Sequence, residues 1–390
     1  MSITSVSPSR PASSGGIPVV DLERVQSVSN RHLQLVEFLR EQNLDGLLIR
    51  QPENFAWLTG GGDNSLQGNA RDPVASVLVT DAARVVLCNN IDSGQLFDRE
   101  LMGLGFLLKE RPWTEPGEVL QQDVCRGRVI GSDSVISGVE TKLVDLRPLR
   151  TTLEPFEIRQ LRELGREVAH AVEATARNFE PGATEAEIAG HLAHRLIKRQ
   201  IEPVQMQVMA DAQGWRYRHW SYGADSIERH CVLSAIGRRH GLHVGACRTV
   251  SIGAPSEELQ HVHGLATLIQ ATGMYFSRPD WTMQETWKRV ARIYEKFEVP
   301  DEWRCAEQGH LLGYSSRESP ILPNSQQTFQ SGMAIFWYPS VRSSLVGDTM
   351  LVNQEGSEIL TSTQNWPVVS VKVKDATIEL PSLLIRECAP

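Results

Sequence analysis

Apolar residues in the first part of the chain follow the spacings of helices and buried strands. From Asp21 to Gln42 they recur every three or four residues, as on one face of a helix, and Asp45–Arg50 reads as a buried strand. Further strands are predicted at Ala75–Thr80, Arg84–Cys88, Phe106–Leu108 and Val129–Gly131, with helices near Gln95–Met102 and Glu118–Cys125. This alternation predicts an α/β domain over residues 21–150. Residues 1–20 are rich in Ser, Pro and Gly and are predicted to form a disordered tail.

The second part of the chain shows two pairs of amphipathic helices, each followed by strands. The first long helix begins after Pro155, and Pro181-Gly182 ends it; Thr184 then starts a second helix, with Glu187 completing a capping box. The second pair lies at Leu259–Thr272 and Met283–Phe297, and strands resume at Ala334–Trp337 and Thr349–Val352. The repeated order hints at an internal duplication. Beyond residue 362, apolar and polar residues alternate from Val368 to Leu380, which is typical of an edge strand.

Composition narrows the class of protein. The chain of 390 residues is 41% hydrophobic and 22% charged, typical of a globular protein that buries a core. A net charge of −8 and a pI near 5.8 argue against a nucleic-acid-binding surface. The six cysteines are scattered without a C-x-x-C motif, which favours free thiols in a reducing compartment. No apolar run is long enough for a membrane span or a signal core, so we expect a cytoplasmic protein with no membrane partner.

A hairpin signal lies between Arg229 and Gly253. Two apolar, β-branched runs flank a glycine-bounded turn at residues 237–241, and the second run contains Arg248-Thr249. Here the chain resembles the pita-bread-fold hydrolases, which include Xaa-Pro aminopeptidase, prolidase, methionine aminopeptidase and creatinase. In that family the hairpin reads D-x-G…G-Y-x-x-D-x-T-R-T.

The resemblance covers roughly residues 30 to 362. It continues through segments that occur in the family's order, at Leu44–Gly60, Phe156–Leu196, Gly332-Met333, Asp348-Thr349 and Glu355–Thr361. It implies a two-domain α/β protein with a creatinase-type N-terminal domain at 21–150, a duplicated pita-bread domain at 151–362 and an extension at 363–390. It also implies a homodimer, because creatinase-type N-terminal domains often complete a neighbour's pocket.

The family binds two divalent metal ions through two Asp, one His and two Glu. At the matching positions this chain has Ala235, Gly245, His310, Tyr338 and Gly347. Two adjacent dications need several carboxylates to offset their repulsion, and only the histidine remains. The resemblance therefore predicts the fold without its dimetal centre, and no cofactor is expected.

Two further family positions point to the substrate. A histidine seven residues beyond the ligand histidine is replaced by Arg317, and the upstream histidine that faces the reacting group matches His219. Creatinase is a metal-free branch of this fold, in which a histidine at the position of His219 handles protons and arginine anchors the substrate carboxylate. We therefore take His219 and His310 as candidate catalytic residues.

Four other residues are candidates for substrate binding: Arg317, Arg248, Glu318 and Tyr338. Arginine binds carboxylates bidentately, and a tyrosine in place of a ligand can donate a phenolic proton. The candidate residues also have structural interpretations. Buried histidines such as the two catalytic candidates are usually hydrogen-bonded core residues, and neighbouring Arg and Glu residues are usually surface charges. The aromatic residues around His219, which are Trp215, Tyr217, Trp220 and Tyr222, either line a small-molecule site or pack a loop.

Three hypotheses follow. The first is a metal-independent hydrolase that cleaves a C–N bond in a small, carboxylate-bearing substrate. The second is a catalytically inactive protein that kept the pocket and binds a small molecule or short peptide. The third is a conventional Xaa-Pro metalloaminopeptidase, which the count of metal ligands disfavours. The histidine pairs elsewhere in the chain, such as His191 and His194, lack the H-E-x-x-H pattern of a zinc site.

Overall fold

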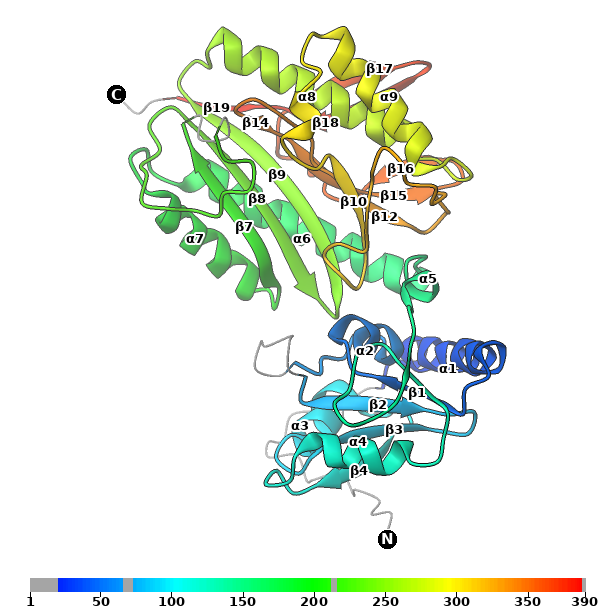
Figure 1. Cartoon of the computed structure of the whole chain (residues 1–390). Coiled ribbons are helices and arrows are strands. Elements are labelled where there is room, and N and C mark those ends of the chain that lie inside the picture. Colours follow the sequence, from blue (N-terminus) through cyan, green and yellow to red (C-terminus); the bar gives the residue numbers. More distant parts are fainter. Residues whose placement is uncertain (1–19, 66–72, 212–215, 388–390) are drawn as a thin grey trace. The chain divides into compact units, whose positions relative to one another are not determined.

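A computed structural model describes residues 20–65, 73–211 and 216–387 (Figure 1). The chain divides into two compact units after Arg150. The predicted disordered tail, up to residue 19, lies outside the described residues. Among the described residues, no helix has the length and apolar character needed to span a membrane.

The first unit is built on a mixed six-stranded sheet in the order β4-β3-β2-β1-β5-β6. The strands are β1 Gly46–Ile49, β2 Ala75–Val79, β3 Arg84–Asn89, β4 Leu107–Arg111, β5 Ile130–Ser132 and β6 Lys142–Leu143. The helical segments are α1 Leu22–Gln42, α2 Pro52–Thr59, α3 Ser93–Gln95 with the π-helical turn Leu96–Glu100, α4 Gly117–Cys125 and α5 Arg147–Arg150. Strands β1 and β2 are buried along their whole length, as their continuous apolar sequences indicate.

The second unit is built on a larger sheet, whose main path runs β11-β10-β12-β15-β9-β8-β7. Its helices are α6 Pro155–Asn178, α7 Glu185–Ile197, α8 Glu257–Phe276 and α9 Met283–Lys296, with a 3₁₀ turn at Glu302–Arg304. Its strands are β7 Glu202–Ala210, β8 His230–Arg239, β9 Leu242–Ile252, β10 Gly309–Leu312, β11 Ser319–Pro320, β12 Ala334–Trp337, β13 Ser340–Val341, β14 Ser344–Leu345, β15 Gly347–Asn353 and β16 Gly356–Ile359. Helix α6 packs on β8 and β9, and α7 packs on β7.

The two halves of the second unit begin alike. Thr184 caps α7 and Thr282 caps α9, each through a capping box with the glutamate three residues later. Each capping threonine also forms an isolated antiparallel bridge, to Ser226 in the first half and to Thr328 in the second. These matching caps and bridges agree with the internal duplication that the order of elements suggested.

The C-terminal extension adds three strands, β17 Val368–Val373, β18 Ala376–Pro381 and β19 Leu384–Arg386. The alternating segment from Val368 to Leu380 does not form one edge strand. It folds into the separate hairpin β17–β18, because the chain turns at Lys374, which has a positive φ of 58°. Strand β19 instead joins the main sheet, parallel to the second half of β9.

Candidate functional site

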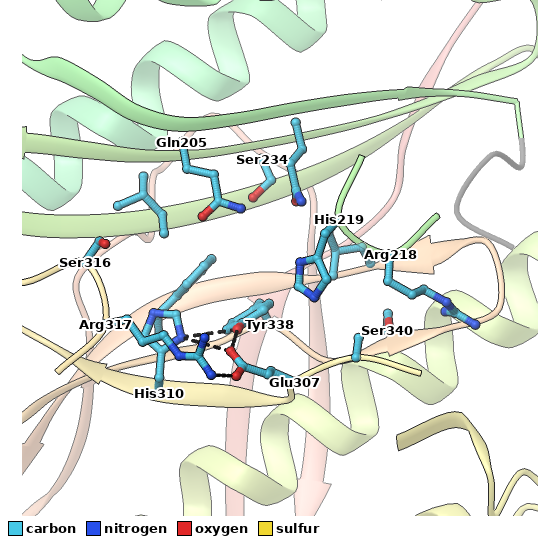
Figure 2. A pocket seen from close by; sticks show the side chains of 15 residues that line it. Gln205, Arg218, His219, Ser234, Glu307, His310, Ser316, Arg317, Tyr338 and Ser340 are labelled. Atoms are coloured by element: carbon cyan, nitrogen blue, oxygen red, sulfur yellow. Dashed lines mark hydrogen bonds and ion pairs between the residues drawn. The ribbon is translucent and has the colours of Figure 1, made fainter. Parts of the chain in front are cut away.

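A pocket of about 180 Å³ lies in the second unit (Figure 2). Its neutral polar lining consists of Gln205, Gln207, Ser234, Ser316 and Ser340, and its ionisable lining of Arg218, His219, Glu307, His310, Arg317 and Tyr338. These side chains come from β7, β8, β10 and β13 and from the loops around them, and β12 contributes Phe336 to the lining. The predicted residues His219, His310, Arg317 and Tyr338 therefore converge on one site.

An aromatic cluster forms one wall of the pocket. The rings of Phe336 and Tyr338 stack with centroids 4.8 Å apart and planes at 18°. The His310 ring meets both edge-on, 5.1 Å from Tyr338 and 5.9 Å from Phe336. The edge-to-face and offset-stacked arrangements are the favoured ones for aromatic side chains, so the cluster is a packed unit.

The ring of Phe336 lies against two of the predicted metal-ligand positions, which are both glycines. A Cβ atom on Gly245 would lie 2.7–2.8 Å from three atoms of that ring. A Cβ atom on Gly347 would lie 3.1 Å from the ring and from the Cβ atoms of Cys247 and Tyr338. Any side chain at residue 245 would therefore collide with Phe336 as it now stands.

The remaining ligand positions also lack the donors that a dimetal centre needs. Ala235 pairs with Ala246 and, because side chains alternate along a strand, faces away from the pocket; its neighbour Ser234 faces it. Neither residue is a carboxylate. Across the described parts of the chain, no cluster of three or more His, Cys, Asp or Glu side chains is arranged to hold a metal ion. The residues present do not fit a pair of divalent ions.

Glu307 is a pocket residue that the sequence analysis did not single out. Its carboxylate accepts a 2.7 Å hydrogen bond from the Tyr338 hydroxyl and forms an ion pair with Arg317. The Tyr338 hydroxyl also lies 3.2 Å from Nδ1 of His310. Glu307 precedes His310 by three residues on the loop into β10, and no motif distinguishes it from other loop glutamates. The charge of Glu307 is thus already shared between an arginine and a tyrosine.

Burial sets the protonation of the cluster. It lowers the pKa of His310 to about 4, so this imidazole is neutral at neutral pH. It raises the pKa of Tyr338 to about 12, although Arg317 opposes the shift, so the phenol keeps its proton. His310 is therefore a weak base in this site.

His219 lies on the segment between β7 and β8 and reaches the pocket from the side opposite His310 (Figure 2). Beside it, Tyr217 and Trp220 stack with centroids 5.2 Å apart. Arg218 donates to the backbone oxygen of Arg342 and forms a 2.8 Å ion pair with Glu302. The aromatic residues thus hold the loop that carries His219, while Trp215 lies outside the described residues.

The structure places Arg248 and Glu318 outside the pocket lining. The guanidinium of Arg248 is buried and donates to Glu173 and Asp348, both at 2.9 Å, and to the backbone oxygen of Thr361. Glu318 is also buried and accepts a 2.9 Å hydrogen bond from the backbone N–H of Ser315. Arg248 stabilises the packing of α6 on the sheet, and neither residue is positioned to bind a pocket ligand.

Comparison with known proteins identifies the family to which this chain is related. The sequence profile of metallopeptidase family M24 matches residues 159–359. An uncharacterized peptidase of Staphylococcus aureus is 20% identical and the match covers 84% of this chain and 97% of that protein. A probable dipeptidase PepE of Mycobacterium tuberculosis is 23% identical over 57% of this chain and 60% of its own length.

Solved structures share this fold. The prolidase of Pyrococcus horikoshii matches with a TM-score of 0.74 at 18% identity, over 88% of this chain and 99% of its own. Dipeptidase PepE of Mycobacterium ulcerans gives 0.75 at 16% identity, over 93% and 99%. The N-terminal domain of the FACT complex subunit SPT16 from chickpea gives 0.69 at 14% identity, over 88% and 97%. The profile spans more than half of the chain, and the protein belongs to metallopeptidase family M24, with the family's two-domain pita-bread fold.

Proposed function

We propose that this protein is a metal-independent hydrolase that cleaves a C–N bond in a small molecule carrying a carboxylate. One observation carries the proposal: His219, Arg317 and Arg218 converge on one pocket, while Phe336 fills the space beside the family's metal-ligand positions. A pocket of about 180 Å³ suits a ligand well below drug size.

The two arginines are the groups that anchor a carboxylate. The side chain of Arg317 is 54% exposed and uses one face for Glu307, which leaves further N–H donors for a ligand. The side chain of Arg218 is only 9% exposed, and its bonds to Glu302 and Arg342 hold it in place. A fixed guanidinium loses little entropy when it binds a carboxylate.

His219 is the group proposed to transfer protons. Histidine is the usual general acid and base near neutral pH. The other pocket imidazole, His310, is too weak a base for this role. With the carboxylate held by arginine, placing the scissile bond and a water molecule beside His219 supplies much of the rate.

Binding without turnover is the second candidate, and a specific observation favours it. Glu307 is the one carboxylate in the described lining of the pocket. It already forms an ion pair with Arg317 and accepts a hydrogen bond from Tyr338. A hydrolase that lacks both a metal ion and a free carboxylate base depends on His219 alone. The conventional metalloaminopeptidase would need a donor set that these residues do not provide.

The same proposal extends to assembly and location. We infer a cytoplasmic homodimer whose partner is a small molecule or short peptide rather than nucleic acid or membrane. The acidic net charge of −8 and the resemblance to creatinase-type proteins support this. Light scattering on the purified chain tests the dimer.

One set of measurements separates the candidates. Small carboxylates with amide, amidine or urea C–N bonds are screened by thermal shift, and the hits are assayed for consumption. His219→Ala is expected to abolish turnover while the protein stays folded, and His261→Ala, at an exposed histidine outside the pocket, is the matched control. Hits that bind without being consumed favour the second candidate. Two metal ions per purified chain, removable with loss of peptidase activity, would overturn both.

A further inference from the structure

One end of the pocket is formed by Arg218 and the β13–β14 hairpin. Arg218 donates to the backbone oxygen of Arg342, which lies in the turn of that hairpin, two residues beyond Ser340. Arg218 and Ser340 therefore lie close together, and both line the pocket. Figure 2 shows them with His219 at the opposite end of the pocket from Arg317.

The side-chain hydroxyl of Ser340 has no hydrogen-bond partner within the described parts of the chain. The residue is 3% exposed, and its backbone pairs with Leu345 across the hairpin, while its side chain belongs to the pocket lining. Buried hydroxyls are nearly always hydrogen-bonded in native proteins, because burial removes their bonds to water. A buried hydroxyl that lines a pocket without a partner indicates a group that a ligand satisfies.

The two arginines of the pocket differ in burial. Each forms an ion pair with a glutamate, Arg218 with Glu302 and Arg317 with Glu307. The side chain of Arg218 is 9% exposed, however, whereas that of Arg317 is 54% exposed. Attraction between charges is strong where water is excluded and weak at exposed side chains. A carboxylate beside Arg218 therefore interacts more strongly than one beside Arg317.

Arg218 and Ser340 together offer hydrogen-bond donors to a ligand. A guanidinium has only donors, and the contacts of Arg218 to Glu302 and Arg342 use only part of them. The serine hydroxyl supplies one more donor. A carboxylate accepts through both of its oxygens, so it can take a hydrogen bond from each side chain. A carboxamide in the same place would turn its own N–H groups toward one of the donors.

We propose that Arg218 and Ser340 form the subsite that binds the substrate carboxylate, and that Ser340 distinguishes a carboxylate from the corresponding amide. The inference rests on the proposed function and narrows its carboxylate anchor from two arginines to one. His219 follows Arg218 directly in the chain and lies at the same end of the pocket. The substrate class is therefore a small acid in which the C–N bond to be cleaved lies close to the carboxylate.

Ser340→Ala tests the role of the hydroxyl without a ligand. Removing a buried hydroxyl that has no partner is expected to leave the urea unfolding midpoint unchanged or higher. Ser76→Ala is the matched control, because Ser76 is 2% exposed, lies on β2 outside the pocket lining, and also has no hydroxyl partner among the described residues. A midpoint lowered more in Ser340→Ala than in the control would reveal a structural hydrogen bond and overturn the inference.

Two probes that differ only in the acid group test the subsite directly. Titration calorimetry is expected to show binding of N-acetylglycine and none of N-acetylglycinamide. Ser340→Ala should weaken N-acetylglycine binding about tenfold, as expected for the loss of one hydrogen bond to a charged group, and Ser76→Ala should leave it unchanged. Arg317→Met should weaken it by less than about threefold. Equal responses to the two probes, including none from either, unchanged affinity in Ser340→Ala, or a larger loss in Arg317→Met would overturn the inference.

Failure of the proposed function gives a different result. A protein that binds N-acetylglycine through Ser340 but consumes none of the screened carboxylates would refute the hydrolase and keep the subsite. A substrate that Ser340→Ala turns over with an unchanged KM would refute the subsite and keep the hydrolase.

Discussion

Phe336 and the glycine at residue 245 are predicted to depend on each other. A Cβ atom on Gly245 would meet three atoms of the Phe336 ring at 2.7–2.8 Å, well inside van der Waals contact. The ring is 2% exposed and stacked on Tyr338, so it has little room to move. Overpacking of this kind costs about 1–3 kcal/mol, and we expect Gly245→Ala to destabilise the second unit by that amount.

The double variant isolates the collision. Phe336→Ala alone should cost about 3–5 kcal/mol, as truncation of a buried aromatic ring generally does. In that background Gly245→Ala should be neutral or slightly stabilising, because alanine loses less backbone entropy than glycine on folding. The expected coupling between the two sites is therefore about 1–3 kcal/mol.

Equilibrium urea unfolding of the four proteins measures this coupling. Gly264→Ala is the control, since a Cβ atom there has no neighbour within 4 Å, and in helix α8 it should stabilise the protein. The reasoning fails if Gly245→Ala costs the same with and without the Phe336 ring. If the coupling holds, an aspartate cannot return to residue 245 unless residue 336 changes as well.

Further predictions concern the charged groups and the metal. Arg248→Met should destabilise the protein by about 3–5 kcal/mol because Glu173 and Asp348 would keep buried charges without their partner, and a smaller loss in urea unfolding would contradict the structural role. Burial lowers the pKa of three histidines from 6.5 to about 4, namely His243, His263 and His310. Below pH 6.5 the unfolded chain therefore binds more protons than the folded chain. The free energy of unfolding is expected to decrease as the pH falls from 6.5 toward 4. Urea unfolding midpoints that stay constant across this pH range would contradict this prediction. Incubation with excess Mn²⁺ followed by dialysis should leave no stoichiometric pair of ions, as elemental analysis can show.

The sequence was sufficient for the fold and for part of the site. The hairpin signal between Arg229 and Gly253 corresponds to β8 and β9, which meet at the positive-φ pair His240-Gly241. Family motifs located His310 and Tyr338 at the pocket wall because His310 has a fixed register on β10, opposite Phe336, and Tyr338 directly follows the end of β12. Turn signals and short motifs of this kind predict well which residues form a strand and where the chain turns.

Side-chain direction was harder to predict, and the misplaced residues show why. Arg248 lies three positions after Gly245, so strand alternation alone turns it to the opposite face, toward α6. The same rule separates Ala235 from Ser234, where a shift of one residue in matching the family motif reverses the face. Glu307 lies on a loop, where no periodicity constrains direction. The contacts that define its role join residues far apart in the sequence.

The late position of β19 in the chain affects how the second unit forms during synthesis. Beyond Cys247, the side of β9 that faces β15 is completed by residues 384–386, with the Gly253 N–H donating to Arg386. The ribosome makes that segment only after everything from α8 to β18. Until then the nascent chain exposes an unpaired strand edge, to which strands of other unfinished chains can add. While this stretch is being translated, residues 250–252 of β9 are therefore open to pairing with another chain.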